Sequence, residues 1–461
     1  MKKDLLHTPE GVRDIYNEEC ARKLVLQNRL EDVCMAYGYN HIQTPTLEFF
    51  DVFSKERGCI PSFEMFKLFD RYGNTMVMRP DMTPSIARTA AKYYAENVLP
   101  VKLWYEGNIF INGSQYYQGK LKETTSIGAE LIGDNSIDAD FEIISMVIDC
   151  MKNSGLKEFQ VEIGNVSFFK GLLYEVGICG DEEEMLVSLI QEKNYIGVEE
   201  LLDSLHIDKH IARVLLELPQ MFGSVDVLDR ARNLTSNKTC MEAIDRLHAL
   251  YDLCKITGVE KYISFDLGLL SKHSYYTGLI FYAYTFGTGE PVAGGGRYDN
   301  LLGQFGCDKP SIGFSITVDS LMAAITRQGL NIPVDITGIL LIYHAGNVVQ
   351  AIFLADKLRA RNIPVSIIAY NEKKSELQYC EYALHSQLAY VVMLPKFSGD
   401  SSASDRALSG EAFSNENLSD EKLFHEILEN KKVNIFSSKN RIKKEMTIAD
   451  LLKSSEEMRK L

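Results

Sequence analysis

Apolar residues in the first part of the chain recur at two spacings, one typical of helices and one of strands. Residues 15–37 carry them at near-helical spacing and precede Gly38, which predicts a helix. Two apolar runs, 66–70 and 75–79, flank Arg71-Tyr72-Gly73-Asn74, a hairpin signal. Further strands are expected at 101–111, 126–132 and 159–163, and helices at 83–95 and 138–152. Because strands and hairpins dominate, an antiparallel sheet with helices packed on it, an α+β domain, is predicted.

Residues 41–48 also have a strand pattern, but Pro45 interrupts it. Proline lacks the N–H that a central strand donates, so an edge or interface position is expected for this strand. A helix carrying Val52 and Phe53 is expected to follow.

The pattern changes at residues 168–258, which are rich in Leu, Glu and Lys at helical spacing and show few strand signals. We interpret this part as a helical insertion. Strand signals return at Ile263 and continue to about Arg327. The sheet is therefore expected to begin in a first core segment, residues 1–167, and to finish in a second, residues 259–328.

A glycine cluster lies between two apolar runs in this second segment. Residues 279–284 are predicted to form a strand, and Gly287-Thr288-Gly289 a turn. Gly294-Gly295-Gly296 precedes Arg297 and lacks every Cβ, so another backbone or a ligand can approach closely. The stretch is either a packed hairpin or a platform for a ligand, and the pattern leaves both open. A small-residue strand at 313–316 is expected to lead into a helix.

Strands and helices alternate from residue 336, which predicts a small parallel α/β domain over residues 336–461. Residues 397–421 are polar and serine-rich and are expected to form a long loop. One more strand is expected at 433–436.

Composition narrows the class of protein. The 461 residues carry a formal charge of -14, and lysine and arginine form no long runs, which argues against a nucleic-acid partner. Nine cysteines without a C-x-x-C pair suit a reduced cytoplasmic protein. The first residues, MKKDLLHTPEGVRD, lack the apolar segment of a signal peptide, and no run of about 18 apolar residues predicts a membrane span.

Common cofactor and metal motifs are missing from the sequence. It has no phosphate-binding G-x-x-x-x-G-K-[ST] loop and no H-E-x-x-H pair. His206 and His210 are four residues apart and would share a helix face, but no third ligand accompanies them, so we interpret the pair as a surface coincidence. No cofactor and no metal are expected.

Two places in the sequence carry candidate binding groups. Arg79-Pro80-Asp81-Met82-Thr83 sets a carboxylate and a hydroxyl where a strand leads into a helix. These groups suit a ligand's ammonium, although either Asp81 or Thr83 would also cap the helix. Glu130 lies in an otherwise apolar strand, where a charge costs free energy unless it is paired, although strand alternation would also let it face solvent.

The chain resembles histidyl-tRNA synthetase and its paralogues in six segments, which occur in this order: YGYNHIQTPTLE, FKLFDRYGNTMVMRPDMT, VKLWYEGNIF, IGAELIG, SYYTGLIFYAYT and GGGRYDNLLGQFG. The match covers residues 8–165 and 262–325, about half of the chain. The resemblance implies the antiparallel sheet of class II aminoacyl-tRNA synthetases, flanked by helices. Pro45 matches the proline of the family's dimer-forming motif, which implies self-association.

Three departures from the synthetase pattern concern its chemistry. The resemblance places an arginine and a glutamate that bind ATP where this chain has Ile111 and Gly113, and a further arginine at Ser271, beside Lys272. Neutral side chains do not stabilise charge at a transferring phosphate, and a lysine does not replace a bidentate arginine. Adenylation is therefore not expected.

The positions that surround the amino acid in the family largely persist. They imply a histidine-binding site made of Asp81, Thr83, Ser126, Glu130, Tyr275 and Tyr276, with Ser126 where the family commonly has glutamine. A retained amino-acid pocket without ATP contacts is similar to the regulatory subunits of ATP phosphoribosyltransferase. That resemblance implies a non-catalytic protein that assembles with a short-form catalytic subunit, is required for the first step of L-histidine biosynthesis, and mediates feedback inhibition by histidine. A divergent histidyl-tRNA synthetase is the alternative, because the C-terminal domain resembles an anticodon-binding module. A synthetase-like enzyme that activates another amino acid is a third.

Overall fold

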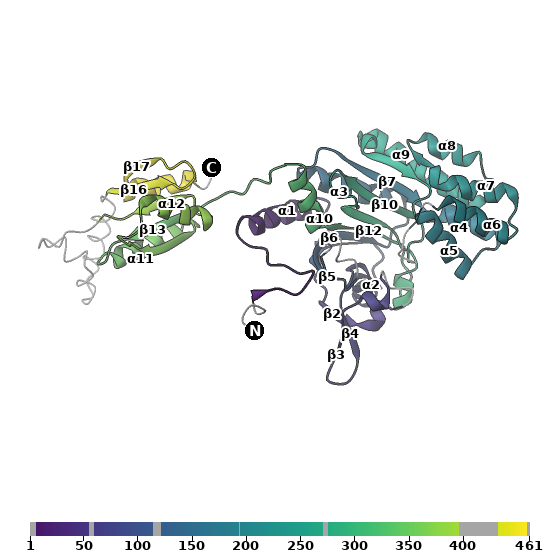
Figure 1. The fold of residues 1–461 in the computed structure, drawn as a ribbon, viewed down its shortest axis with the longest axis horizontal. Helices are drawn as coiled ribbons and strands as arrows, with labels where there is room; N and C mark the ends of the chain where they lie inside the picture. Colours follow the sequence, from purple (N-terminus) through teal and green to yellow (C-terminus); the bar gives the residue numbers. More distant parts are fainter. Residues whose placement is uncertain are drawn as a thin grey trace, which may run out of the picture. The chain divides into compact units, whose positions relative to one another are not determined.

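The computed structural model describes residues 6–54, 60–113, 121–192, 194–270, 275–395 and 432–458. The chain divides into two compact units (Figure 1): Met1–Asp14 with Lys23–Ile332, and Ile15–Arg22 with Pro333–Leu461. Ser271, Lys272 and the loop expected at 397–421 lie outside the described residues.

A nine-stranded sheet forms the centre of the larger unit. Its strand order is β1-β5-β6-β12-β11-β10-β7-β9-β8. The strands are β1 (Asn40–His41), β5 (Val101–Phe110), β6 (Glu123–Ile132), β7 (Phe159–Asn165), β8 (Phe222–Gly223), β9 (Ile263–Asp266), β10 (Leu279–Thr285), β11 (Ala293–Arg297) and β12 (Ser311–Thr317). Neighbouring strands pair antiparallel, except for β1 with β5 and β7 with β9, which are parallel. The predicted α+β class is confirmed, with a sheet that is mixed at its edges.

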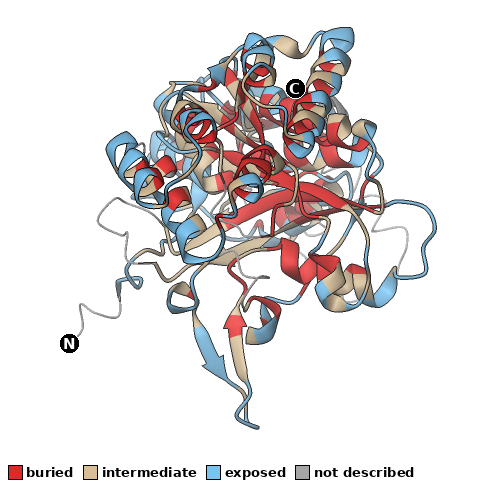
Figure 2. Ribbon diagram, turned by 90° about the vertical axis from the view of Figure 1, so that its right-hand side faces the viewer, coloured by how far each residue is buried: buried red, intermediate tan, exposed pale blue. Residues whose placement is uncertain are grey.

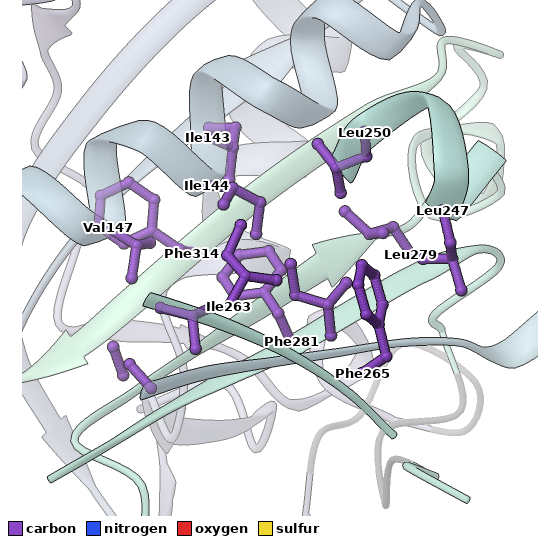
Figure 3. Close-up of a cluster of buried hydrophobic side chains, with 14 of the residues drawn as sticks. Ile143, Ile144, Val147, Leu247, Leu250, Ile263, Phe265, Leu279, Phe281 and Phe314 are labelled. Carbon is purple, nitrogen blue, oxygen red and sulfur yellow. The ribbon is translucent and has the colours of Figure 1, made fainter. Parts of the chain in front are cut away.

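Alternation along each strand divides the side chains between two faces. Ile127, Ala129 and Leu131 of β6 join the main hydrophobic cluster, whereas Glu130 between them lies on the opposite face. Helices α1 (Asn17–Ala36), α3 (Ile137–Ser154), α9 (Lys238–Thr257) and α10 (Val318–Arg327) contribute to that cluster. Figure 3 shows side chains of α3 and α9 packed on those of β9, β10 and β12. Each fully buried side chain of this kind contributes about 1.5–3 kcal/mol.

The expected insertion is largely helical. It comprises α4 (Val166–Val176), α5 (Asp181–Gln191), α6 (Tyr195–Ser204), α7 (Lys209–Glu217), α8 (Asp226–Arg232) and α9, with the short strand β8 between α7 and α8. Helix α9 (Lys238–Thr257) is capped at its start by Asn237, whose side chain accepts a hydrogen bond from the Cys240 N–H, and at its end by Gly258, which has a φ of 75°. The apolar sides of these helices join the same cluster as the sheet.

A second, three-stranded antiparallel sheet has the order β2-β4-β3, with bounds Leu47–Phe49, Thr75–Met78 and Lys67–Phe69. The hairpin signal is confirmed: Asp70 accepts hydrogen bonds from the N–H groups of Tyr72 and Asn74 in the turn between β3 and β4. Much of this hairpin is exposed, in contrast to the buried strands of the large sheet (Figure 2).

The expectation for residues 41–48 is confirmed: the strand is interrupted, and its two parts, β1 and β2, are each an edge strand of their sheet. Between them, the Arg79 guanidinium donates to the carbonyl oxygens of Thr44 and Pro45 at 2.7 and 3.5 Å, which satisfies backbone groups that a strand would pair. The helix expected at Val52 is wrong, since only a single 3-10 turn, Phe50–Val52, forms there.

The smaller unit contains a five-stranded sheet of order β14-β13-β15-β16-β17. Its elements are β13 (Ile339–Tyr343), α11 (Val348–Arg359), β14 (Val365–Ala369), α12 (Glu376–His385), β15 (Tyr390–Met393), β16 (Lys432–Ser437), β17 (Lys443–Thr447) and α15 (Ile448–Met458). The parallel prediction is right for β14, β13 and β15. It is wrong for β16 and β17, which are antiparallel. The strand expected at 433–436 is confirmed as β16.

No helix within the described ranges is long and apolar enough to cross a membrane. Those ranges also contain no group of three or more His, Cys, Asp or Glu side chains placed to hold a metal ion. His206 and His210 are both exposed, as the surface interpretation of the pair requires.

Candidate functional site

A cavity of 240 Å³ lies in the larger unit, on the sheet face that carries Glu130. Strands β5, β6, β10, β11 and β12 form its floor, and the start of α2 (Thr83–Tyr93) forms one side. The residues that line it are Ile60, Pro80, Asp81, Thr83, Ile109, Ile111, Glu130, Tyr275, Tyr276, Tyr282, Pro291, Val292, Ala293, Gly294, Tyr298, Gly313, Phe314, Ser315 and Thr317. Five of the six residues expected from the sequence therefore meet in one place.

Glu130 is the most deeply buried acid of this pocket, at 1% exposure. Its Oε1 accepts a hydrogen bond from Thr83 Oγ1 at 2.8 Å, and its Oε2 accepts one from the Tyr298 hydroxyl at 2.5 Å. Burial raises the pKa of Glu130 from 4.5 to about 8. The two hydrogen bonds oppose this rise and the nearby Asp81 adds to it. The alternative that Glu130 faces solvent is wrong.

The space for this carboxylate comes from Gly313, which pairs with Glu130 across β12 and β6. A Cβ on Gly313 would lie 1.6 Å from Glu130 Oε2. Non-bonded atoms do not approach so closely, so no other residue fits at position 313 while the carboxylate stays where it is.

Asp81 lies between β4 and α2 and has two roles. Its Oδ1 accepts hydrogen bonds from the Met82 and Thr83 N–H groups at 2.6 and 3.3 Å. Its Oδ2 is 3.4 Å from the Tyr275 hydroxyl, which donates toward it. The helix-capping alternative is thus partly right, because Asp81 binds free N–H groups at the start of α2 while it also lines the pocket.

Aromatic side chains enclose the ligand space. The rings of Tyr275 and Tyr276 have centroids 4.8 Å apart, and Tyr298 meets Tyr275 edge to face at 6.0 Å. Burial raises the pKa values of Tyr276 and Tyr298 well above their ordinary range, so both hydroxyls stay neutral. The sequence analysis did not predict Tyr298 as a site residue, because its role depends on its contact with Glu130 from a distant strand.

Ser126 is the one expected site residue that does not line the pocket. It is buried, and its hydroxyl lies 2.7 Å from that of Ser315, which does line it. Ser126 therefore reaches the ligand space only through Ser315.

The glycine cluster is both a packed hairpin and part of the ligand pocket, the two alternatives that its sequence allowed. Gly294 to Gly296 lie in β11, and a Cβ on Gly296 would lie 2.9 Å from the Tyr276 ring. The cluster is thus a packed hairpin that makes room for the pocket's tyrosine. Among the departures from the synthetase pattern, Ile111 lines the pocket, whereas Gly113 lies near the Glu64 carboxylate.

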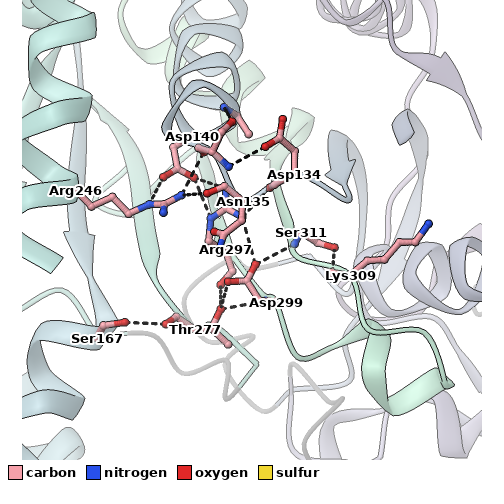
Figure 4. A network of polar contacts seen from close by, with 12 residues as sticks. Asp134, Asn135, Asp140, Ser167, Arg246, Thr277, Arg297, Asp299, Lys309 and Ser311 are labelled. Carbon is pink, nitrogen blue, oxygen red and sulfur yellow. Dashed lines mark hydrogen bonds and ion pairs between the residues drawn. The ribbon is translucent and has the colours of Figure 1, made fainter. Parts of the chain in front are cut away.

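Arg297, which follows the cluster, belongs to a buried ion network (Figure 4). Its Nε and Nη2 donate to Asp140 Oδ1 at 3.0 and 2.6 Å, and Arg246 of α9 donates to Asp140 Oδ2 at 2.5 Å. Asp299 also pairs with Arg297, at 3.3 Å. The network joins β11, α3 and the insertion, so Arg297 has a structural role.

A model of the histidyl-tRNA synthetase family matches residues 11–321. An ATP phosphoribosyltransferase regulatory subunit of Acetivibrio thermocellus is 38% identical over 78% of this chain and 86% of its own length. That of Clostridium acetobutylicum is 42% identical over 69% and 79%.

Solved structures agree with these relatives. A Bacillus halodurans structure, described as an ATP phosphoribosyltransferase regulatory subunit/histidyl-tRNA synthetase, has a TM-score of 0.73 and 31% identity, covering 86% of this chain and 99% of that one. Histidyl-tRNA synthetase of Nostoc matches 99% of both chains with a TM-score of 0.75, and at 18% identity it shows the fold alone. The pocket, the fold and these relatives together place the chain in the family of ATP phosphoribosyltransferase regulatory subunits, which has the fold of histidyl-tRNA synthetase.

Proposed function

We propose that this chain is the non-catalytic regulatory subunit of an ATP phosphoribosyltransferase and that it binds histidine in the pocket of Asp81 and Glu130. The observation that carries the proposal is the meeting of two carboxylates in one small, tyrosine-lined cavity. Histidine brings an ammonium and an imidazole, and both carry N–H donors. A carboxylate held out of water needs such a partner, because its own desolvation costs free energy.

The acceptors of the pocket suit two separate N–H groups. Glu130 is held by Thr83 and Tyr298, which fix both its oxygens while each oxygen keeps a further lone pair. Asp81 is fixed through Oδ1 by the start of α2, which leaves Oδ2 directed toward Tyr275 and the cavity. Both acids are thus held in place before a ligand arrives, and a ligand gains affinity when its site needs little reorganisation.

Apolar residues in the pocket lining support a regulatory role over adenylation. Ile109 at the end of β5 and Ile111 just after it both line the pocket, and the resemblance to synthetases would place an ATP-binding arginine at Ile111. An apolar side chain offers no charge to a transferring phosphate. The curated names of the relatives likewise favour a regulatory subunit over a divergent synthetase.

A regulatory subunit of this family acts with a catalytic ATP phosphoribosyltransferase subunit, and we propose the short form of that enzyme as the partner. Histidine would then inhibit the first step of L-histidine biosynthesis only if it binds two states of the assembly with different affinities. A cytoplasmic location and the absence of a nucleic-acid partner stay predictions.

The chain is also proposed to self-associate through the β2-β4-β3 sheet. Cross-strand pairing puts Leu47, Phe49, Leu68, Met76 and Met78 on one face. Leu47, Phe49 and Leu68 are 47%, 56% and 42% exposed, and the segment that contains Pro45 leads directly into this face. An exposed apolar surface of this kind is typical of a contact between copies.

Co-expression with a short-form catalytic subunit tests the proposal. The pair is expected to join ATP to phosphoribosyl pyrophosphate, the catalytic subunit alone to be inactive, and histidine to inhibit the pair. Charging of tRNA with histidine by the purified chain would contradict a regulatory function. Pyrophosphate exchange with a panel of amino acids tests for activation of another amino acid.

A further inference from the structure

A second groove lies in the larger unit, at the end of the large sheet where β7 and β9 begin and β10 ends. Its volume of 640 Å³ is typical of sites that bind small molecules. The residues that line it are Lys157, Glu158, Phe159, Gln160, Lys261, Tyr262, Tyr284, Thr285 and Phe286. None of these lines the pocket of Asp81 and Glu130, so the groove is a separate feature of the unit.

The groove spans three neighbouring strands, of which β7 is the middle one. Tyr284 and Phe286 come from the end of β10 on one side, and Lys261 and Tyr262 precede β9 on the other. Because neighbouring strands lie about 4.8 Å apart, roughly 10 Å separates the two sides. A ligand that fills the groove therefore meets the aromatic rings of β10 at one end and a lysine at the other.

Hydrogen bonds fix the backbone on the β10 side. Thr285 Oγ1 donates to the Glu158 carbonyl oxygen at 2.7 Å. Gln328 Nε2 donates to Thr285 Oγ1 at 2.9 Å and to the Phe286 carbonyl oxygen at 2.7 Å. The Phe286 side chain is nevertheless 76% exposed, and Tyr284 in the same groove is partly exposed. An aromatic ring presented to water on an ordered backbone is a surface on which a planar group of a ligand can stack.

The Tyr262 ring holds two lysines at the other side. It stacks on Phe159 with ring centroids 4.7 Å apart, and the Nζ atoms of Lys152 and Lys261 lie 5.0 and 5.1 Å from its centre. Lys152 also pairs with Asp149 at 3.3 Å, whereas Lys261 lines the groove. The attraction between an ammonium and an aromatic ring thus holds positive charge at the groove.

The described lining has a net positive charge. It contains Lys157, Lys261 and one acid, Glu158, in a chain whose formal charge is -14. Glu158 contacts Thr285 through its backbone carbonyl oxygen and not through its carboxylate. A lysine ammonium has three N–H donors and binds phosphate as a point charge. This side of the groove therefore suits the anionic group of a ligand.

We propose that the groove binds a nucleotide, with the base stacked on Phe286 and the phosphates at Lys157 and Lys261. Rings alone would accept many aromatic compounds, and lysines alone many anions. A nucleotide joins a planar ring to an anion through a sugar, which matches the separation of the two sides. The inference goes beyond the proposed function, which assigns no nucleotide to this chain, and it does not depend on histidine binding.

Calorimetric titration of the full chain with ADP, adenosine and pyrophosphate tests this, with saturating histidine present to occupy the pocket of Glu130. ADP is expected to bind. Adenosine lacks the phosphates and pyrophosphate lacks the ring, so each is expected to bind about tenfold or more weakly than ADP. A short single-stranded oligonucleotide, which offers the same groups as part of a nucleic acid, is expected to bind no more tightly than ADP.

Two groove variants and two matched controls locate the binding. Lys261→Gln and Phe286→Ser are each expected to weaken ADP binding about tenfold or more. Lys238→Gln and Phe222→Ser should leave ADP binding unchanged. Lys238 is 91% exposed at the start of α9, and Phe222 is 62% exposed and pairs with Asp266 at the far end of β9.

Four results would overturn the inference. They are no ADP binding up to about 1 mM, equal ADP binding by wild type and both groove variants, fragments that bind as tightly as ADP, and an oligonucleotide that binds more tightly than ADP. Each leaves the proposed function intact if histidine still binds. ADP binding without histidine binding would contradict the proposed function alone.

Discussion

The carboxylate of Glu130 occupies the place where a side chain on Gly313 would begin. The two residues pair across β6 and β12, and a Cβ on Gly313 would lie 1.6 Å from Glu130 Oε2. The binding group and the space it needs thus come from strands that are far apart in the sequence but adjacent in the sheet.

Gly313→Ala is expected to displace this carboxylate. Histidine binding should weaken about tenfold or more, and the free energy of unfolding should fall by about 1–3 kcal/mol, since a methyl group is forced into a filled space. Calorimetry and urea denaturation measure the two effects. Gly278→Ala is the matched control, because its Cβ would lie at an ordinary 3.6 Å from Arg297 Cδ. Unchanged binding in Gly313→Ala would contradict the placement of Glu130.

Histidine binding should release a proton from Glu130. Burial raises the pKa of this carboxyl to about 8, so below that pH the empty pocket holds it protonated. A bound cation favours the ionised form and lowers the pKa, and the proton leaves. Titrations in buffers of different ionisation enthalpy measure the release, which should disappear above about pH 8. The release should also be absent in Glu130→Gln, and a release that persists in this variant would assign the proton to another group.

The raised pKa of Glu130 also makes the free energy of unfolding depend on pH. The folded chain holds the Glu130 proton up to about pH 8, whereas the unfolded chain loses it near 4.5. Between these values the folded state binds more protons, so the free energy of unfolding should fall as pH rises through this window. Glu130→Gln lacks this contribution and should become more stable relative to wild type toward alkaline pH. Chemical denaturation of both proteins at several pH values in this window measures the difference. If the free energy of unfolding changes with pH in parallel for the two proteins, Glu130 is not a buried acid with a raised pKa.

Two variants of the ion network around Asp140 are expected to lose different amounts of unfolding free energy. Arg246→Met removes one partner and should cost about 1–3 kcal/mol of unfolding free energy. Asp140→Asn should cost more, about 3–5 kcal/mol, because Arg297 is then a buried charge without its strongest partner. Chemical denaturation measures both. An equal cost in the two variants would argue against Asp140 as the centre of the network.

Self-association should depend on one face of the small sheet. Phe49→Ser is expected to shift the chain toward monomer, since burying such a side chain between copies is worth about 1.5–3 kcal/mol. Phe69→Ser is the matched control: Phe69 is 75% exposed, but it pairs with Thr75 and lies on the other face. Sedimentation velocity over a range of concentrations distinguishes the two. Equal behaviour of both variants would locate the contact elsewhere.

Local patterns predict the elements of this fold well where neighbouring residues decide them. The hairpin of β3 and β4 was expected because its turn residues lie between its two strands in the sequence. The strand that contains Glu130 was expected from its apolar residues. The face that Glu130 occupies was left open, because the answer depends on Gly313 and Tyr298 from distant strands. The interruption between β1 and β2 was expected from Pro45, whereas the hydrogen bonds that Arg79 donates there, from more than thirty residues later, were not.

The most direct test of the account uses Glu130→Ala in the reconstituted complex with a short-form catalytic subunit. Activity of the complex with and without histidine, and assembly of the two subunits, are measured for wild type and variant. We predict that the variant assembles and activates the catalytic subunit while its inhibition by histidine is weakened about tenfold or more. Loss of assembly and inhibition to the same extent, or of neither, would contradict a histidine sensor at Glu130.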